Sequence, residues 1–274
     1  MKGVRLYDQF LRGWARLAGR PACRRLNNFL LNLGLRGLGV GNEGLLTGER
    51  WLLQARARQW LRGVDNPVVI DGGANEGDYT VAMLATLAEA RVYAFEPHPE
   101  TSRRLRSRLN ELGAQVSVQV CALGARETVL RLWDYTETEG SQHASLSREV
   151  IEQMHGGVAR GYEVPVVTLD DFTKRNGITR IDWLKLDVEG FEFDCLRGAA
   201  ELIAQDAVGV VQVEFNAMHR QTRTFCEDLV GAFPGHSWYR LLPRGLLPLP
   251  RHDVLRMELF EVQNLIGLPK GIEA

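Results

Sequence analysis

Cysteine is scarce in this sequence, and the few cysteines lie far apart. The 274 residues include four, Cys23, Cys121, Cys195 and Cys226, and no two of them form a CxxC pair. This spacing excludes a zinc ribbon and a dense disulfide framework. We therefore expect the protein to reside in a reducing cytoplasm.

Long apolar runs are also missing. No stretch of 18 apolar residues occurs, so we expect no transmembrane helix. Arginines interrupt the first 40 residues too often for the apolar core of a secretion signal. Because 45% of the residues are hydrophobic and 24% are charged, the chain can still bury a full globular core.

A net charge of −1 conceals a basic N-terminal region. Residues 1–40 hold eight basic side chains against Asp8 alone, a net charge of +7, so the remainder carries −8. Apolar side chains recur there at spacings of three and four, which predicts an amphipathic helix with a cationic face; they are Tyr7, Phe10, Leu11, Trp14 and Leu17. We expect residues 1–50 to form a basic helical extension and residues 51–274 to form the main domain.

Three roles for this extension stay open. It packs on its own domain or on a twin subunit in a homodimer, it binds the acidic inner face of a membrane as a peripheral contact, or it is a cleaved transit peptide. We expect no nucleic-acid partner.

From residue 67 onward, apolar strand-like runs alternate with helical ones. Strands are predicted at 67–71, 91–96, 115–123, 181–187 and 208–215, with helices at 79–90 and 100–112 after the first two. This alternation predicts an α/β fold with a parallel sheet covered on both faces. Residues 127–167 interrupt it with two strand-like runs that predict an added hairpin or edge. Two C-terminal runs leave no room for a helix between them, so they should pair antiparallel.

A glycine-rich corner follows the first predicted strand, in "VVIDGGANEGDYT" at 68–80. Ligands of parallel sheets bind beyond the carboxyl ends of the strands, where the strand order reverses. Gly72, Gly73 and Gly77 let the backbone turn and lie close to a ligand. The spacing matches neither GxGxxG nor the P-loop. Asp71 stands before the glycines and suits a cationic amine rather than a pyrophosphate.

Glu96 ends the second predicted strand, 25 residues after Asp71. A carboxylate at that place can accept both hydroxyls of a ribose. The ligand would then be a nucleoside whose tail carries an amine and a carboxylate, as S-adenosylmethionine does. The two motifs in this order predict a methyltransferase.

Several segments together resemble the FkbM-type methyltransferases, from about residue 47 to "VQNLIGL". They are "VIDGGANEGDYT", "AFEPHPE", "CALG", "TLDDF", "IDWLKLDVEGFEFDCLRGA" and "VQVEFN". "DVEG" after a strand and "TLDDF" upstream are the specific parts. The resemblance implies a class I, Rossmann-like fold with a mostly parallel seven-stranded sheet and an antiparallel C-terminal strand. It also implies O-methylation of a hydroxyl on a sugar, a glycan or a secondary metabolite.

We expect S-adenosylmethionine to contact the corner, the end of the second strand and the "CALG" segment. No acidic residue follows the third strand, so the contact to the adenine amine stays unassigned and Ala122 and Leu123 are expected beside the ring. The expected cofactor-binding residues are Asp71, Gly72, Gly73, Ala74, Asn75, Gly77, Glu96, Pro97, Ala122, Leu123 and Asp187.

A hydroxyl acceptor must lose a proton, which calls for a base or a metal ion. Asp187 ends the fourth strand and Glu214 ends the fifth, so their carboxylates could form a base cluster. With Asn216 they could instead hold Mg²⁺, which is the less favoured alternative. Glu189 is either part of this cluster or a cap of the helix that follows it. The alternative bases are His219, just after the fifth strand, and His143, in the excursion.

Two rival functions remain open. One is a degenerate methyltransferase fold that serves as a binding or scaffold protein, which the intact set of Asp71, Glu96 and Asp187 disfavours. The other is an NAD-dependent enzyme, which the absent fingerprint and the lack of a Tyr-x-x-x-Lys pair disfavour.

Overall fold

The computed structural model describes residues 2–41, 46–110, 116–135, 159–250 and 252–274. Its centre is a sheet with the strand order β10-β9-β11-β8-β7-β1-β2-β3. The strands are β1 (Val68–Gly72), β2 (Arg91–Phe95), β3 (Val116–Gln119), β7 (Ile181–Leu186), β8 (Val208–Phe215), β9 (His236–Leu242), β10 (Gly245–Pro248) and β11 (Gln263–Pro269).

The strand directions confirm the predicted class I fold. Strands β3, β2, β1, β7 and β8 are parallel, and β11 runs antiparallel between β8 and β9. The described sheet has eight strands rather than the predicted seven, because β10 adds to the edge by pairing with β9. A short helix, α12 (Val254–Met257), lies between the two C-terminal strands, where the sequence predicted none.

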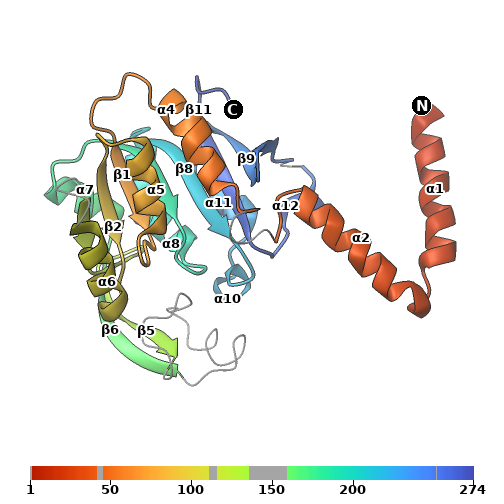
Figure 1. Ribbon diagram of the computed structural model, residues 1–274, viewed down its shortest axis with the longest axis horizontal. Helices are drawn as coiled ribbons and strands as arrows, with labels where there is room; N and C mark the ends of the chain where they lie inside the picture. The colour runs from red at the N-terminus through yellow and green to blue at the C-terminus, as the bar shows by residue number, and fades with distance from the viewer. Residues whose placement is uncertain (1, 42–45, 111–115, 136–158, 251) are drawn as a thin grey trace.

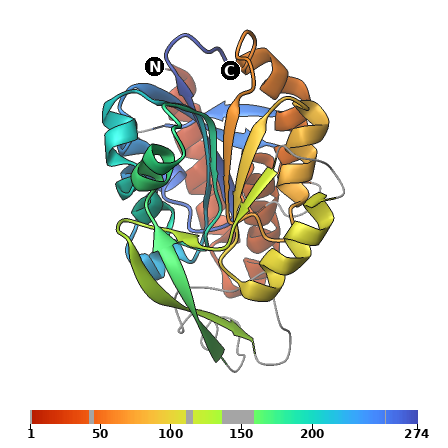
Figure 2. The same ribbon diagram turned by 90° about the vertical axis from the view of Figure 1, so that its left-hand side faces the viewer.

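Helices cover both faces of the sheet, as the apolar strands require. Figure 2 shows the sheet between the two helical layers. One face carries α3 (Glu49–Leu52), the π-helical turn η3 (Leu53–Ala57), α4 (Arg58–Trp60), α5 (Asp78–Thr86) and α6 (Pro99–Asn110). The other carries α7 (Leu169–Arg175), α8 (Glu192–Arg197), α9 (Ala200–Ala204) and α11 (Cys226–Gly231).

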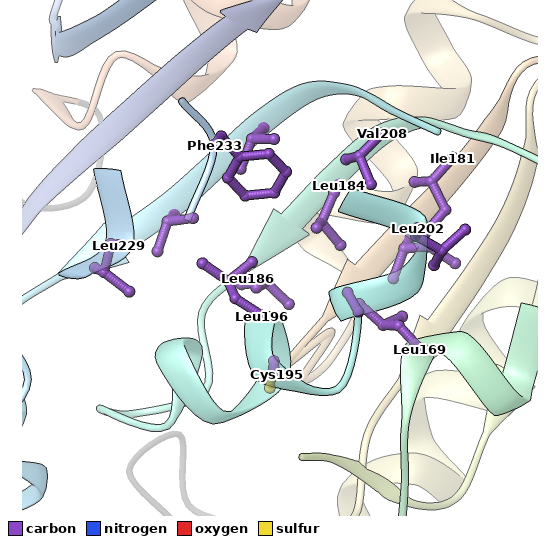
Figure 3. Close-up of a cluster of buried hydrophobic side chains, with 14 of the residues drawn as sticks. Leu169, Ile181, Leu184, Leu186, Cys195, Leu196, Leu202, Val208, Leu229 and Phe233 are labelled. Atoms are coloured by element: carbon purple, nitrogen blue, oxygen red, sulfur yellow. The ribbon is translucent and has the colours of Figure 1, made fainter. Parts of the chain in front are cut away.

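The larger part of the core lies under α7, α8, α9 and α11 (Figure 3). Leu184 and Leu186 of β7 are fully buried there against Cys195 and Leu196 of α8. This packing fixes both ends of the loop 187–191, which leaves the sheet at the end of β7.

A second sheet lies beyond the carboxyl ends of the parallel strands (Figure 2). It has the order β4-β6-β5, with β4 (Ala122–Leu123), β5 (Thr128–Tyr135) and β6 (Ala159–Val167). The antiparallel pairing of β5 with β6 confirms the predicted hairpin. The strand predicted at 115–123 is divided, because the chain leaves the main sheet after Gln119 and Ala122 pairs with Val166 of β6.

The N-terminal region forms two helices, α1 (Lys2–Ala18) and α2 (Arg24–Gly37), joined by the turn η1 (Pro21–Cys23). Figure 1 shows both helices beside the β9 side of the sheet, with α1 the farther from it. The chain rejoins the sheet at Gly41, whose N–H donates to the Val262 carbonyl at 2.6 Å. Within the described residues, no helix is both long and apolar enough to span a membrane.

Candidate active site

A cavity opens where the strand order reverses, between β1 and β7. Residues that follow β1, β2, β3 and β7 line it, and Leu132 of β5 closes it from the second sheet. The lining residues are Gly73, Asn75, Phe95, Glu96, Pro97, Thr101, Cys121, Ala122, Leu123, Leu132, Asp187, Val188, Glu189 and Phe191. Seven residues of the expected cofactor set are therefore in the lining: Gly73, Asn75, Glu96, Pro97, Ala122, Leu123 and Asp187.

The glycine corner is held rigidly against two neighbouring strands. The N–H groups of Gly73 and Ala74 both donate to the Phe95 carbonyl, at 3.0 and 2.9 Å. Gly73 has a φ of 78°, and a Cβ there would collide with the Asp187 carbonyl oxygen. Only glycine therefore allows the corner to pass so close to the end of β7.

Asp71 does not line the cavity. Its side chain is fully buried, where Oδ2 accepts a hydrogen bond from Thr80 Oγ1 at 2.6 Å and Oδ1 lies 3.4 Å from Lys185 Nζ. Its side-chain partners are thus Thr80 and Lys185, and a direct contact with a cofactor amine stays a prediction. Gly72, Ala74 and Gly77 also lie outside the lining, so they shape the corner rather than the cavity wall.

Lys185, which the sequence analysis overlooked, is the centre of this region. It is 4% exposed, and its ammonium lies 3.3 Å from Asp187 Oδ2 and 3.4 Å from the Gly73 carbonyl. Although burial alone would lower the pKa of Lys185, the charges of Asp187 and Asp71 raise it well above its ordinary value. The side chain is therefore a permanent cation that joins the corner to the end of β7.

Lys185 belongs to a buried polar row on the face of the sheet under α5. Asp71, Lys185 and Gln212 are direct register partners on β1, β7 and β8. Gln212 accepts from Tyr79 Oη at 2.7 Å and donates to Glu49 Oε1 at 2.8 Å. Burial raises the pKa of Glu49, which Lys185 partly offsets. The row thus connects the glycine corner to Glu49 in α3.

Glu96 is 8% exposed and lines the cavity at the end of β2. Its two oxygens each accept one backbone hydrogen bond, Oε2 from Asn75 at 3.0 Å and Oε1 from His98 at 2.8 Å. Burial raises its pKa to about 7, against the lowering effect of these two donors. Each carboxylate oxygen keeps a further lone pair that can accept from a ligand.

His98 ties the second sheet to this corner. Its Nδ1 accepts from the Glu100 N–H at 3.2 Å, at the start of α6, and its Nε2 lies 3.2 Å from Asp134 Oδ2 on β5. Both side chains are at most 1% exposed. The pair therefore fixes β5 over the cavity next to Glu96.

Further carboxylates gather near the end of β7. Asp187, one third exposed, and Glu189 line the cavity directly, and Glu214 lies behind them with Oε1 accepting from Asn216 Nδ2 at 2.7 Å. Burial raises the pKa of Asp187 and Glu214, while burial and the Asp187 charge raise that of Glu189 to about 8. We call Asp187, Glu189 and Glu214 the acidic cluster.

Glu189 is not a helix cap. The helix α8 begins at Glu192 with Phe191 at its N-cap. Glu189 itself has a φ of 56°, which is uncommon outside glycine. Such a backbone persists only where its surroundings hold it, and it directs attention to the cavity that Glu189 lines.

His219 lies away from the cavity. It is fully buried, its Nδ1 accepts from the Asn216 N–H at 3.2 Å, and its Nε2 lies 2.9 Å from Glu192 Oε2. With both ring nitrogens engaged, His219 supports the loop after β8, and its role as a base stays a prediction. His143 lies outside the described residues. Among the described residues, no group of three or more His, Cys, Asp and Glu side chains is arranged to hold a metal ion. A Mg²⁺ site formed by Asp187, Glu214 and the Asn216 amide stays a prediction.

Comparison with known proteins identifies the family. The model of the FkbM methyltransferase domain matches residues 71–259. The chain belongs to this family. The match spans the glycine corner, the end of β2, the acidic cluster and the second sheet. All cavity-lining residues described above fall within it.

Three of the curated relatives are methyltransferases by name. Methyltransferase sdnD of Sordaria araneosa is 28% identical over 50% of this chain and 61% of its own length. The 2-O-methyltransferase NoeI of Sinorhizobium fredii is 23% identical over 60% of this chain and 76% of its own length. The chain thus spans about three fifths of the first relative. Precorrin-6y C5,15-methyltransferase of Geobacter metallireducens, a solved structure, is 12% identical with a TM-score of 0.42, over 81% of this chain and 87% of that one.

Proposed function

We propose that this FkbM family member transfers a methyl group from S-adenosylmethionine to a hydroxyl oxygen. The observation that carries the proposal is the cavity at the strand-order reversal, which is lined by Glu96 and by Asp187 and Glu189 of the acidic cluster. The name of the relative NoeI, a 2-O-methyltransferase, supports oxygen as the methylated atom.

The residues present fit the cofactor. The free lone pairs of Glu96 suit the two ribose hydroxyls, and the apolar side chains of Ala122 and Leu123 suit an adenine ring. The backbone at Gly73 and Asn75 would hold the amino-acid tail. Asp71 acts indirectly, because it positions Lys185. When bound, S-adenosylmethionine supplies a methyl group that its sulfonium already activates.

The acidic cluster would take the acceptor proton. A general base works best when its pKa lies near the operating pH. Burial raises the pKa of Asp187, and it raises that of Glu189 to about 8. Asp187 is the best candidate, because it faces the cavity and its charge is balanced by Lys185 at 3.3 Å. Glu189 lies beside it in the same wall, and Glu214 couples to both.

The acceptor would enter between the second sheet and the loop after β8. We infer a hydroxyl of a sugar, a glycan or a secondary metabolite, as the family resemblance implies. Carboxylates that face the acceptor can also hold neighbouring hydroxyls by hydrogen bonds, which suits a polyhydroxylated substrate.

Asp187→Asn tests the chemistry. We expect turnover to fall by about 10² to 10⁴, the usual cost of losing a general base, while S-adenosylmethionine affinity stays within about threefold. Turnover is read as S-adenosylhomocysteine released with a panel of sugar and polyhydroxylated acceptors. Asp194→Asn is the matched control, because its side chain is 39% exposed and pairs with Arg197 outside the cavity. Near-normal turnover of Asp187→Asn would make Asp187 a structural residue.

Chelation separates the two ways in which Asp187 could act. Activity that is lost in EDTA and restored by Mg²⁺ would assign Asp187 and Glu214 to a metal site, whereas activity that survives EDTA would leave the carboxylate as the base. Calorimetry with S-adenosylmethionine and NAD tests the rival functions. A scaffold without catalysis is supported if neither compound binds, and an NAD enzyme if only NAD binds.

A further inference from the structure

The two N-terminal helices expose apolar side chains that the other described residues do not cover. On α1, Phe10 is 66% exposed and Leu17 69%, and Tyr7, Leu11 and Trp14 of the same face are exposed as well. On α2, Leu26, Phe29, Leu30 and Leu33 are also exposed. We call these nine side chains the apolar face. Soluble proteins rarely leave so many large apolar residues together in water, so the face indicates a docking surface.

Packing on the chain's own domain, one of the roles left open by the sequence, is not what the structure has. Among the described residues, the first backbone hydrogen bond from this region to the rest of the chain follows α2, where Val40 is buried and Gly41 bonds to Val262. Ala18 is the one buried residue among the described side chains of α1. Since no other described residue covers the apolar face, the face is available to a binding partner.

The net charge of the N-terminal region indicates which kind of partner binds the apolar face. Residues 1–40 carry a net charge of +7, and the exposed arginines include Arg12, Arg16, Arg24 and Arg25. A basic helix with a large apolar face is typical of segments that lie in the interface of an anionic membrane. Trp14 and Tyr7 are the aromatic types that favour this depth.

We propose that α1 and α2 dock on an anionic lipid surface. In a symmetric dimer the same surface of each copy would meet the other, so two regions of +7 would be brought together. A membrane with acidic headgroups instead satisfies the arginines and the apolar side chains at once. The helices leave from the β9 side of the sheet (Figure 1), whereas the cavity lies between β1 and β7, so docking leaves the cavity open.

Vesicle sedimentation with the full-length protein tests this proposal. We expect binding to vesicles of phosphatidylcholine and phosphatidylserine, weaker binding at high salt, and none to phosphatidylcholine alone. Arg12→Gln with Arg16→Gln should weaken binding about 30-fold, taking about 1 kcal/mol for each arginine. Arg103→Gln with Lys270→Gln, two exposed basic residues elsewhere, is the control and should bind as the unaltered protein does.

A second pair of variants tests the apolar face. Phe10→Glu with Trp14→Glu should weaken binding at least 10-fold, since about 0.8 kcal/mol is lost for each CH₂ group removed from the membrane. Val254→Glu with Leu255→Glu, which are 69% and 86% exposed outside these helices, is the matched control. Because all four positions are exposed, the melting temperature of the main domain should not change.

Three outcomes would overturn the proposal. The first is no binding to anionic vesicles, and the second is unchanged binding after Phe10→Glu with Trp14→Glu. The third is a dimer in light scattering that this variant converts to monomers, which would make a second copy the occupant of the face. S-adenosylmethionine affinity is measured alongside, and it should be equal in all variants whatever the lipid result.

Discussion

Glu96 offers a test of the cofactor site that needs no knowledge of the acceptor. Its pKa is raised to about 7 by burial, and only the ionised carboxylate can accept from both ribose hydroxyls. The ionised fraction is then about nine tenths at pH 8 and about one tenth at pH 6. Since apparent affinity scales with the competent fraction, we expect the Kd for S-adenosylhomocysteine to rise about tenfold from pH 8 to pH 6.

Glu96→Gln should remove this pH dependence and weaken binding at pH 8. Charge-assisted hydrogen bonds are worth about 1.5 to 3 kcal/mol, which corresponds to about 10- to 150-fold in Kd. The assay is isothermal titration calorimetry at pH 6, 7 and 8. Glu100→Gln is the control, because Glu100 is 41% exposed and pairs with Arg103 outside the cavity.

A ligand analogue makes the test specific to the ribose. The 2′-deoxy analogue of S-adenosylhomocysteine should bind the unaltered protein more weakly than the parent compound. Glu96→Gln should weaken binding of the analogue less than binding of the parent compound, because only the bond to the 3′-hydroxyl remains to be lost. The reasoning is refuted if Glu96→Gln binds the parent compound with unchanged affinity and an intact fold. It is also refuted if the tenfold pH effect persists in Glu96→Gln.

Three further substitutions probe the groups around the cavity. The pKa of Glu189 rises from 4.5 to about 8 on folding, so between these pH values the folded protein holds a proton that the unfolded chain has lost. The stability of the folded protein therefore falls as pH rises from 4.5 to about 8. Glu189→Gln should reduce this fall, which melting curves over that pH range would measure. Lys185→Met leaves Asp71 and Asp187 without their cation and should lower the free energy of unfolding by about 3 to 5 kcal/mol in urea titrations. His219→Ala should lower the melting temperature without shifting the pH profile of turnover, and a shifted profile with an unchanged melting temperature would restore His219 as a base.

The sequence was sufficient for the architecture of the parallel sheet. Apolar runs ended by turns predict strands, and the helices between them require parallel pairing. The departure came at "VCALG", where one apolar run serves two sheets. A change of partner strand at Gln119 depends on where β6 lies, and β6 is more than 40 residues away in the chain. Short-range periodicity contains no such information.

The sequence predicted which residues lie near the cavity more accurately than it predicted the contacts of their side chains. Glu96 and Asp187 line the cavity as expected, since both follow the carboxyl ends of strands. Asp71 lies inside β1, one residue before its end at Gly72, on the face covered by α5, so its side chain contacts Thr80 and Lys185. A lysine inside the apolar run "IDWLKL" was the signal for this pairing, because a buried cation requires an anionic partner.

Lys185 also changes how the acidic cluster should be understood. One buried cation faces Asp71, Asp187, Glu49 and Glu214, so the carboxylates outnumber the charge that stabilises their ionised forms. Each ionisation then raises the cost of the next, and the protons leave in steps that belong to the whole group. The pH profile of turnover will therefore report macroscopic pKa values of the cluster. A base can be assigned to Asp187 only by comparing substitutions within the cluster, because every one of them shifts the titration of the others.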